Sequence, residues 1–127
     1  MKFVKAVLGL LLLPFSVGYA QDKPNDGIRS FWTGNDLYEW CSQGAPTSGQ
    51  GEVNIATCRM YVVGVVDAIH SISATQNIGC VFSLPRGITM QQLQDVVTKH
   101  LRDEPESRHY TAYSQVVVAL KAVFPCR

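Results

Sequence analysis

The longest regular pattern of apolar positions runs from residue 54 to residue 73. A strand would need strict alternation of apolar and polar residues, and the valine pairs at 62–63 and 65–66 break it. Wound as a helix at about 100° per residue, the segment places its apolar side chains on one broad stripe. The stripe consists of Cys58, Tyr61, Val62, Val65, Ala68, Ile69 and Ile72. The pattern therefore predicts a central helix, with Asn54 or Thr57 as its N-cap residue.

The opposite side of this helix carries a second, narrower line of residues. They are Met60, Gly64, Asp67 and Ser71, with Val63 and His70 beside them. A glycine in mid-helix costs about 1 kcal/mol, so it commonly marks the close approach of another backbone. One interpretation is an ordinary solvated face. The other is a contact surface on which Met60, Gly64 and Asp67 meet another helix of the chain or a second subunit.

Three further helices are predicted around the central one. The first covers residues 37–41 and precedes a loop over residues 42–51 that is rich in helix breakers. The next begins at Thr89, where Thr89 and Gln92 match a capping box, and ends before Pro105. The last runs from about residue 111 to residue 123. These elements predict an all-α fold, a small domain of four helices.

The core of this domain is expected from the inward positions of each helix. They are Leu37, Trp40 and Cys41, then Leu93, Val96, Val97 and Leu101, and then Tyr113, Val116, Val117 and Leu120. Residues 75–86 have no helical period, and Val81 and Phe82 are expected to form a short extended stretch.

The first twenty residues have the organisation of a secretory signal peptide. A basic start with Lys2 and Lys5 precedes an apolar run over residues 6–15, and residues 18–20 are suitable for cleavage. The apolar run is too short for a membrane span. We therefore expect residues 1–20 to be removed, residues 21–32 to form a flexible lead-in, and residues 33–127 to form the domain, with no membrane span left.

The four cysteines all lie after the signal peptide. An even number in an exported chain implies two disulfides, for which the sequence permits three pairings. We expect the pairs Cys41–Cys58 and Cys80–Cys126. The first closes a short helix–loop–helix, and the second ties the C-terminus to the middle of the chain. Each closure stabilises the fold by roughly 3–4 kcal/mol by a loop-entropy estimate.

Charge and motif content exclude several classes of function. Without Lys2 and Lys5 the chain has nine basic and ten acidic side chains, and the absence of a basic patch argues against nucleic-acid binding. The chain has no Cys-x-x-Cys, no His-x-x-x-His, no glycine-rich phosphate loop and no Gly-x-Ser-x-Gly. We therefore expect no catalysis, no cofactor and no metal site.

Four short motifs follow one another along roughly residues 36 to 126. They are Cys58-x-x-Tyr61-x-x-Gly64-x-x-Asp67-Ala68, Cys80 followed by Pro85-x-Gly87-Ile88-Thr89, Pro105-Glu106-x-Arg108-His109, and Ala119-Leu120-x-x-x-Phe124-Pro125-Cys126. Together they resemble the Rap/Tai family of periplasmic immunity proteins of bacterial type VI secretion. One departure from that family is the segment 81–84 between Cys80 and Pro85, which implies a longer loop.

The resemblance implies an all-helical, often homodimeric protein of the periplasm whose partner is a protein toxin. The toxin would be a peptidoglycan amidase delivered by a rival or sister cell, and the protein would occlude its active site without catalysis of its own. A second interpretation is a small periplasmic helical acid-stress chaperone, which unfolds at low pH as carboxylates protonate. A third, a small secreted enzyme, is disfavoured by the missing catalytic motifs.

The segment 102–109, between the last two helices, is where we predict the partner contacts. A blocker of an enzyme cleft needs a convex element on a rigid base; Pro105 stiffens this segment, and its charges are not needed by the core. The candidate contact residues are Asp103, Glu104, Glu106 and Arg108. The loop over residues 42–51 is the competitor, but its glycines make it costlier to order. The plainer interpretation is a solvated turn in which Glu106 and Arg108 cap helix ends.

Overall fold

The computed structural model describes residues 31–44 and 47–127. The expected signal peptide and residues 21–30 of the expected lead-in lie outside the described residues. The helices are α1 (Gly34–Cys41), α2 (Gly49–Gln76), α3 (Met90–Asp103) and α4 (Ala112–Val123), with one 3-10 turn, η1 (Pro105–Ser107), between α3 and α4. The described residues form no strand, only an isolated bridge between Thr33 and Thr111. The predicted all-α fold of four helices is confirmed.

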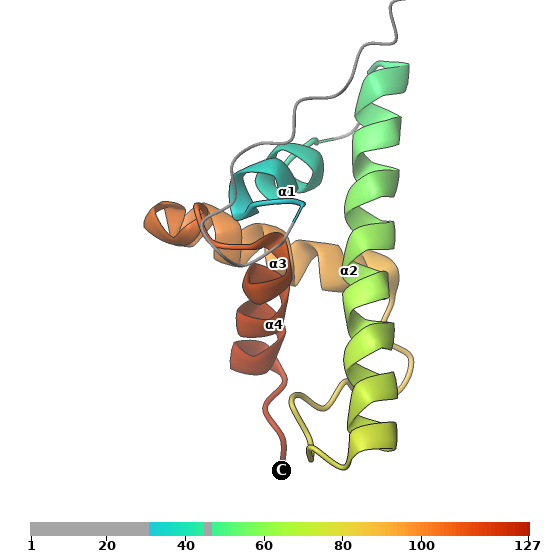
Figure 1. Ribbon diagram of the computed structural model, residues 1–127. Helices are drawn as coiled ribbons and strands as arrows, with labels where there is room; N and C mark the ends of the chain where they lie inside the picture. The colour runs from blue at the N-terminus through green and yellow to red at the C-terminus, as the bar shows by residue number, and fades with distance from the viewer. Residues whose placement is uncertain (1–30, 45–46) are drawn as a thin grey trace, which may run out of the picture.

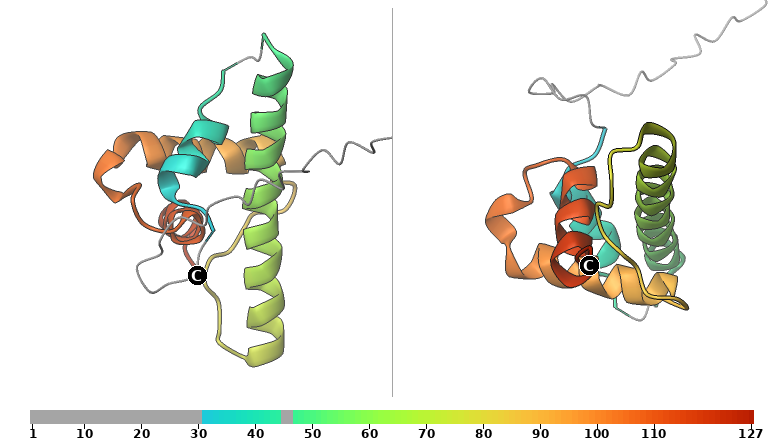
Figure 2. Two further views of the ribbon diagram at one scale, coloured as in Figure 1. Left: turned by 45° about the horizontal axis from the view of Figure 1, so that its top comes forward. Right: turned by 90° about the horizontal axis from the view of Figure 1, so that it is seen from below.

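The long helix α2 forms one side of the molecule (Figure 1). α3 starts beside α2 and runs to the opposite end, where η1 turns the chain back into α4, as both views of Figure 2 also show. α1 packs against α2, α3 and α4. The outer side of α2 and the turn after α3 therefore lie at opposite ends of the molecule.

One apolar core joins the four helices. Its buried members are Leu37, Cys41, Cys58, Val62, Val65, Val66, Ile69, Phe82, Leu93, Val97, Leu101, Ala112, Val116, Ala119 and Leu120. All but Phe82 come from helices. Phe82 anchors the irregular segment between α2 and α3, which contains no strand where an extended stretch was expected at Val81 and Phe82.

The start of α2 differs from the prediction. The helix begins at Gly49, and the N-cap is Ser48, whose side chain accepts a hydrogen bond from the Gly51 backbone (3.3 Å), so neither Asn54 nor Thr57 caps it. Ser48 has the short oxygen-bearing side chain that N-caps require. The breaker-rich loop is consequently shorter than expected, because residues 49–51 are helical.

The buried stripe of α2 is also turned relative to the predicted one. Val66 is buried, whereas Ala68 is exposed and Ile72 is 37% exposed. The cause is the segment after α2, which packs on the Val66 side and brings the Phe82 ring 5.7 Å from the His70 ring. Apolar positions on the other edge of the stripe remain partly open to solvent.

The ends of the other helices follow local capping, but one inward residue is wrong. α1 begins at Gly34, three residues before the predicted start, because Thr33 and Asp36 form a capping box there. The predicted box of Thr89 and Gln92 at the start of α3 is confirmed. In α4, Tyr113 is 44% exposed rather than inward, since the helix instead buries Ala112, Gln115 and Ala119.

Both predicted disulfides are present. Cys41–Cys58 joins the end of α1 to α2 with a Cα–Cα distance of 5.1 Å, and Cys80–Cys126 joins the segment after α2 to the C-terminus at 6.1 Å. The first is buried and the second is exposed.

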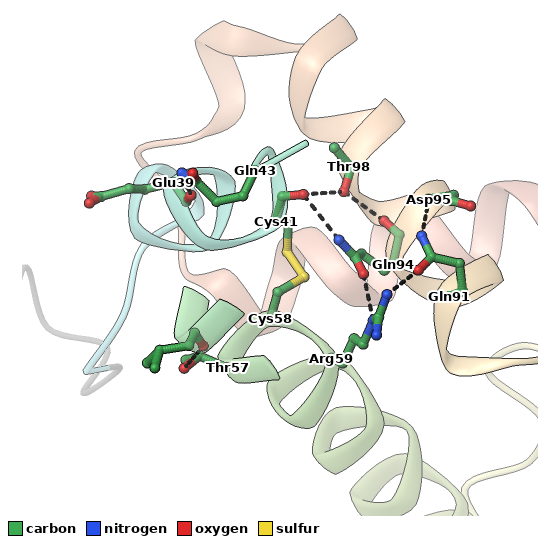
Figure 3. Close-up of a disulfide and its surroundings, with 11 residues drawn as sticks. Glu39, Cys41, Gln43, Thr57, Cys58, Arg59, Gln91, Gln94, Asp95 and Thr98 are labelled. Atoms are coloured by element: carbon green, nitrogen blue, oxygen red, sulfur yellow. Dashed lines mark hydrogen bonds between the residues drawn. A yellow bond between two sulfur atoms is a disulfide. The ribbon is translucent and has the colours of Figure 1, made fainter. Parts of the chain in front are cut away.

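Polar side chains surround the buried disulfide (Figure 3). The carbonyl oxygen of Cys41, at the end of α1, accepts hydrogen bonds from Gln94 Nε2 (3.2 Å) and Thr98 Oγ1 (3.3 Å) on α3. Arg59 on α2 donates to Gln94 Oε1 (2.8 Å) and also to Gln91. The buried amide of Gln94 is thereby satisfied on both sides, and three helices are fixed together at this point.

Candidate partner-binding surface

The connector, residues 104–110, reverses the chain between α3 and α4. Glu104 leaves helical geometry (φ −123°, ψ 63°) because Pro105 follows it. The carbonyl oxygen of Glu104 then accepts a hydrogen bond from Ser107 N (3.1 Å), which closes the turn η1, and Ser107 Oγ lies 3.0 Å from the same oxygen. At the far end of the connector, the Tyr110 carbonyl accepts from Gly34 N (2.9 Å). The connector is thus held internally and against α1.

Acidic and aromatic side chains project from this end of the molecule. Asp103, Glu104, Glu106, His109 and Tyr110 are all exposed. A hydrogen bond from the Lys99 ammonium, with smaller charge effects, lowers the pKa of the Asp103 carboxyl below its ordinary value. The rings of His109 and Tyr110 lie 4.1 Å apart, and His109 Nδ1 is 2.7 Å from the Glu106 carbonyl oxygen. This end of the molecule therefore presents an ordered surface with three exposed carboxylates, beside the exposed cations of Lys99 and Arg102.

Arg108 serves the fold, which corrects the prediction that the charges of this segment are not needed by the core. Its Nε donates to the Leu101 carbonyl, its Nη2 donates to the Arg102 carbonyl (3.4 Å), and its guanidinium lies 3.7 Å from the centre of the Tyr38 ring. The last carbonyls of a helix lack hydrogen-bond donors within the helix, and Arg108 donates to two of these carbonyls at the end of α3. Its own carbonyl accepts from Asn35 N (2.9 Å). Arg108 is half-buried and joins α3, the connector and α1.

The second predicted surface, on the outer side of α2, is open. Met60 is 60% exposed, and Gly64 and Asp67 are exposed. A Cβ added at Gly64 would meet nothing within 4 Å, so no described residue packs on it. The alternative in which Gly64 contacts another helix of the same chain is therefore wrong for the described residues, and contact with a second subunit stays a prediction.

Sequence reasoning missed two further features. An aromatic row of Trp32, Trp40 and Tyr61 covers the junction of α1 and α2, with centroids 5.0 Å and 6.2 Å apart along the row. Burial raises the pKa of the Tyr61 hydroxyl, and a hydrogen bond with the backbone of Tyr113 opposes this effect. The other feature is an open groove of about 410 Å³. Its lining residues are Pro85, Arg86, Gly87, Ile88, Gln92, Asp95, Val96 and Phe124. Both combine segments distant in sequence, so no local pattern indicates them.

Two features of the part of the chain that the structure describes concern metal binding and membrane insertion. Within residues 31–44 and 47–127, no three His, Cys, Asp or Glu side chains are grouped so that they could hold a metal ion. α2 is long and apolar enough to cross a membrane by length and composition. Its buried stripe, however, packs into the common core with the other helices.

A family model describing the Rap1a immunity proteins matches residues 33–126. The chain belongs to the Rap1a immunity protein family. The matched range begins at Thr33, the N-cap residue of α1, and ends at Cys126, so it includes all four helices, both disulfides and the connector. No curated protein matches the chain. As a Rap1a protein it has an immunity role, which implies a toxin as its partner, and immunity proteins are generally not enzymes.

Proposed function

We propose that this Rap1a protein is a periplasmic immunity protein that binds and occludes a peptidoglycan amidase delivered by type VI secretion. The observation that carries the proposal is the family match, which extends over the whole folded body including the connector. The closed disulfides fit an oxidising compartment such as the periplasm. An amidase that cuts peptidoglycan acts in that same compartment, where the immunity protein would meet it.

The connector is the element that we assign to the cleft of the amidase. Its turn η1 lies at the end of the molecule far from α2 in Figure 1 and Figure 2, while its Arg108–Tyr110 part packs against α1. Asp103, Glu104 and Glu106 are exposed, while Arg108 and the turn η1 hold the backbone beneath them. The hydrogen bonds beneath it fix the connector backbone before binding, which lowers the entropy that the connector loses on binding. Its carboxylates fit a cleft with basic groups at the rim.

We further propose that the protein is a homodimer whose subunits meet through the outer side of α2. This side is free along a helix about 42 Å long, and Gly64 permits close approach of a second backbone. Pairing about a two-fold axis uses the same surface on both copies. Because the connector lies at the other end of the molecule, each subunit of such a dimer keeps its connector free for an amidase.

The test is inhibition of a type VI peptidoglycan amidase, taken from the gene next to this one where that gene encodes such an enzyme. Purified amidase digests isolated peptidoglycan, and the release of soluble fragments is followed with increasing amounts of the immunity protein. We expect inhibition near equimolar ratio, and we expect the triple variant Asp103→Ala, Glu104→Ala, Glu106→Ala to weaken it more than tenfold, about 1.4 kcal/mol.

The matched control is Glu52→Ala, which removes an exposed carboxylate from the first turn of α2, at the other side of the molecule. It should inhibit like the wild-type protein. Failure of the wild-type protein to inhibit the amidase would refute the proposed function. Full inhibition by the triple variant would refute the connector as the contact surface and leave residues 42–48 or the outer side of α2.

A further inference from the structure

A buried polar network lies directly behind the connector. Its centre is Gln115 on α4, which is only 3% exposed. The Gln115 Nε2 donates to the Ser107 carbonyl (3.0 Å), and Gln115 Oε1 accepts from Ser107 Oγ (2.9 Å). The third partner is His100 on α3, whose Nε2 lies 3.1 Å from the same Oε1. One side chain of α4 thus holds both the turn η1 and a histidine.

These contacts determine which nitrogen of His100 carries its proton. A backbone carbonyl accepts but does not donate, so the amide nitrogen of Gln115 must face Ser107. The amide oxygen then faces His100, and His100 Nε2 must be the donor. A neutral His100 ring therefore has its hydrogen on Nε2 and a lone pair on Nδ1.

The lone pair of Nδ1 faces a carboxylate. Glu104 Oε1 lies 3.6 Å from His100 Nδ1, and Glu104 is the residue at which the connector begins. Two acceptors gain nothing from facing one another. A proton on Nδ1 converts the same pair into an attractive ion pair. The side chain of His100 is only 10% exposed, so the change from two facing acceptors to an ion pair takes place at the edge of the core.

Other charges modify this pair without replacing it. The charged and titratable groups on the elements near the ring are Asp95, Lys99, Arg102 and Asp103 on α3, Glu104, Glu106, Arg108 and His109 on the connector, Asp36 and Glu39 on α1, and Lys121 on α4. The α4 side chain that contacts the ring is the neutral Gln115. Arg108 opposes a second positive charge near the end of α3. Asp103 acts in the opposite direction, and the negative end of the α3 dipole also favours a cation in its last turn.

We propose that Gln115, His100 and Glu104 form a proton-sensitive latch for the connector. With His100 protonated, the ring links Gln115 of α4 to Glu104 and holds the start of the connector against the body. With His100 neutral, the link to Gln115 remains and the link to Glu104 is lost. The consequence for a partner rests on the proposed function: a connector held in one conformation loses less entropy on binding, so toxin binding strengthens as the pH falls.

Hydrogen–deuterium exchange on the protein alone tests the latch. Exchange is measured at about pH 5.5 and about pH 7.5, across the range in which imidazoles change charge, and is corrected for the intrinsic pH dependence of amide exchange. We expect residues 104–110 of the wild-type protein to be about two- to fivefold better protected at the lower pH, as a partly exposed ion pair allows.

Two variants remove the proton sensitivity in different ways. His100→Gln keeps an N–H donor for Gln115 but cannot take up the proton, and Glu104→Gln keeps the backbone turn but removes the carboxylate. Both should show equal protection of residues 104–110 at the two pH values. Peptides from residues 55–66 of α2 report global stability and should not change.

Either of two results would overturn the latch: pH-independent protection in the wild-type protein, or an undiminished pH effect in both variants. Neither measurement uses an amidase. A failed latch therefore leaves the inhibition test of the proposed function intact, and a failed inhibition test leaves the exchange result standing.

Discussion

Gly34→Ala probes the junction between α1 and the connector. Gly34 is buried at the first position of α1. A Cβ built there would lie 2.8 Å from the Arg108 carbonyl oxygen, 2.9 Å from Arg108 Cα and 2.9 Å from Gln115 Cγ. All three distances are shorter than van der Waals contact. Two of the atoms belong to the backbone and cannot rotate away, so alanine must displace α1, the connector or both.

The cost follows from overpacking. Extra atoms in a filled interior typically lower the free energy of unfolding by about 1–3 kcal/mol. The higher helix propensity of alanine offsets at most about 1 kcal/mol of this loss. We expect Gly34→Ala to lower the free energy of unfolding by about 1–2 kcal/mol. For a body of this size the melting temperature should fall by roughly 5–15 °C. Amide exchange in residues 104–110 should also accelerate, because the displaced atoms include the Arg108 backbone.

Gly49→Ala is the matched control. Gly49 also occupies the first position of a helix, but a Cβ there meets nothing within 4 Å. Its stability should equal or slightly exceed that of the wild-type protein in thermal and urea unfolding. Wild-type stability of Gly34→Ala, or an equal loss in both variants, would refute the packing argument.

Four further outcomes are expected. Replacing Cys80 and Cys126 by alanines should lower the free energy of unfolding by about 4 kcal/mol, and replacing Cys41 and Cys58 should lower it by about 3 kcal/mol. The difference follows from loop closure, because the two pairs are separated by 46 and 17 residues. Urea unfolding measures both losses, and the reverse order would contradict the estimate. A mild dithiol should open the exposed pair Cys80–Cys126 first, as peptide mapping would show. Arg108→Ala should cost about 1–3 kcal/mol, and Arg108→Lys should not restore it, because lysine cannot repeat the forked hydrogen bonds and the stacking on Tyr38; full rescue by lysine would contradict this. Gly64→Leu should dissociate the proposed dimer in sedimentation experiments without lowering the stability of the monomer. A wild-type protein that sediments as a monomer would refute the proposed dimer.

Features set by local chemistry could be predicted from the sequence. A capping box needs two side chains three residues apart, so Thr89 and Gln92 indicate the start of α3 without knowledge of the fold. Pro105 ends α3 by a steric effect on the residue before it. The disulfide pairing followed from the order of the elements, because each pair joins chain segments that the helix arrangement brings together.

Features that depend on neighbours distant in sequence could not be predicted. Gly49 and Gly51 indicate a loop locally, yet α2 extends through them from Ser48. Tyr113 shows the same limit, since α4 turns a glutamine and alanines inward and leaves the tyrosine at the surface. A hydrophobic period defines a stripe, but the packing of other segments decides which edge of the stripe is covered.

The features of the candidate site also separate into those that local sequence determines and those that distant neighbours determine. The position of the connector and its exposed carboxylates were accessible from the sequence, because a charged segment with a proline between two helices indicates an exposed turn. A helix-capping role for Arg108 was one of the two interpretations of this segment, and the structure confirms it at the end of α3. The contact of its guanidinium with Tyr38 could not be predicted, because Tyr38 lies on α1, far away in sequence.

The shape of the connector is consequently a product of three helices. On α1, Gly34 has no side chain and so leaves room for the connector backbone. The end of α3 provides carbonyl groups that accept hydrogen bonds from Arg108, and α4 provides the buried amide of Gln115, which donates to the Ser107 carbonyl. Each contribution acts on the backbone, so the exposed carboxylates of Glu104 and Glu106 can vary without loss of the turn. A backbone fixed from behind, with exposed side chains in front, would permit the proposed contact surface to change while the fold is retained.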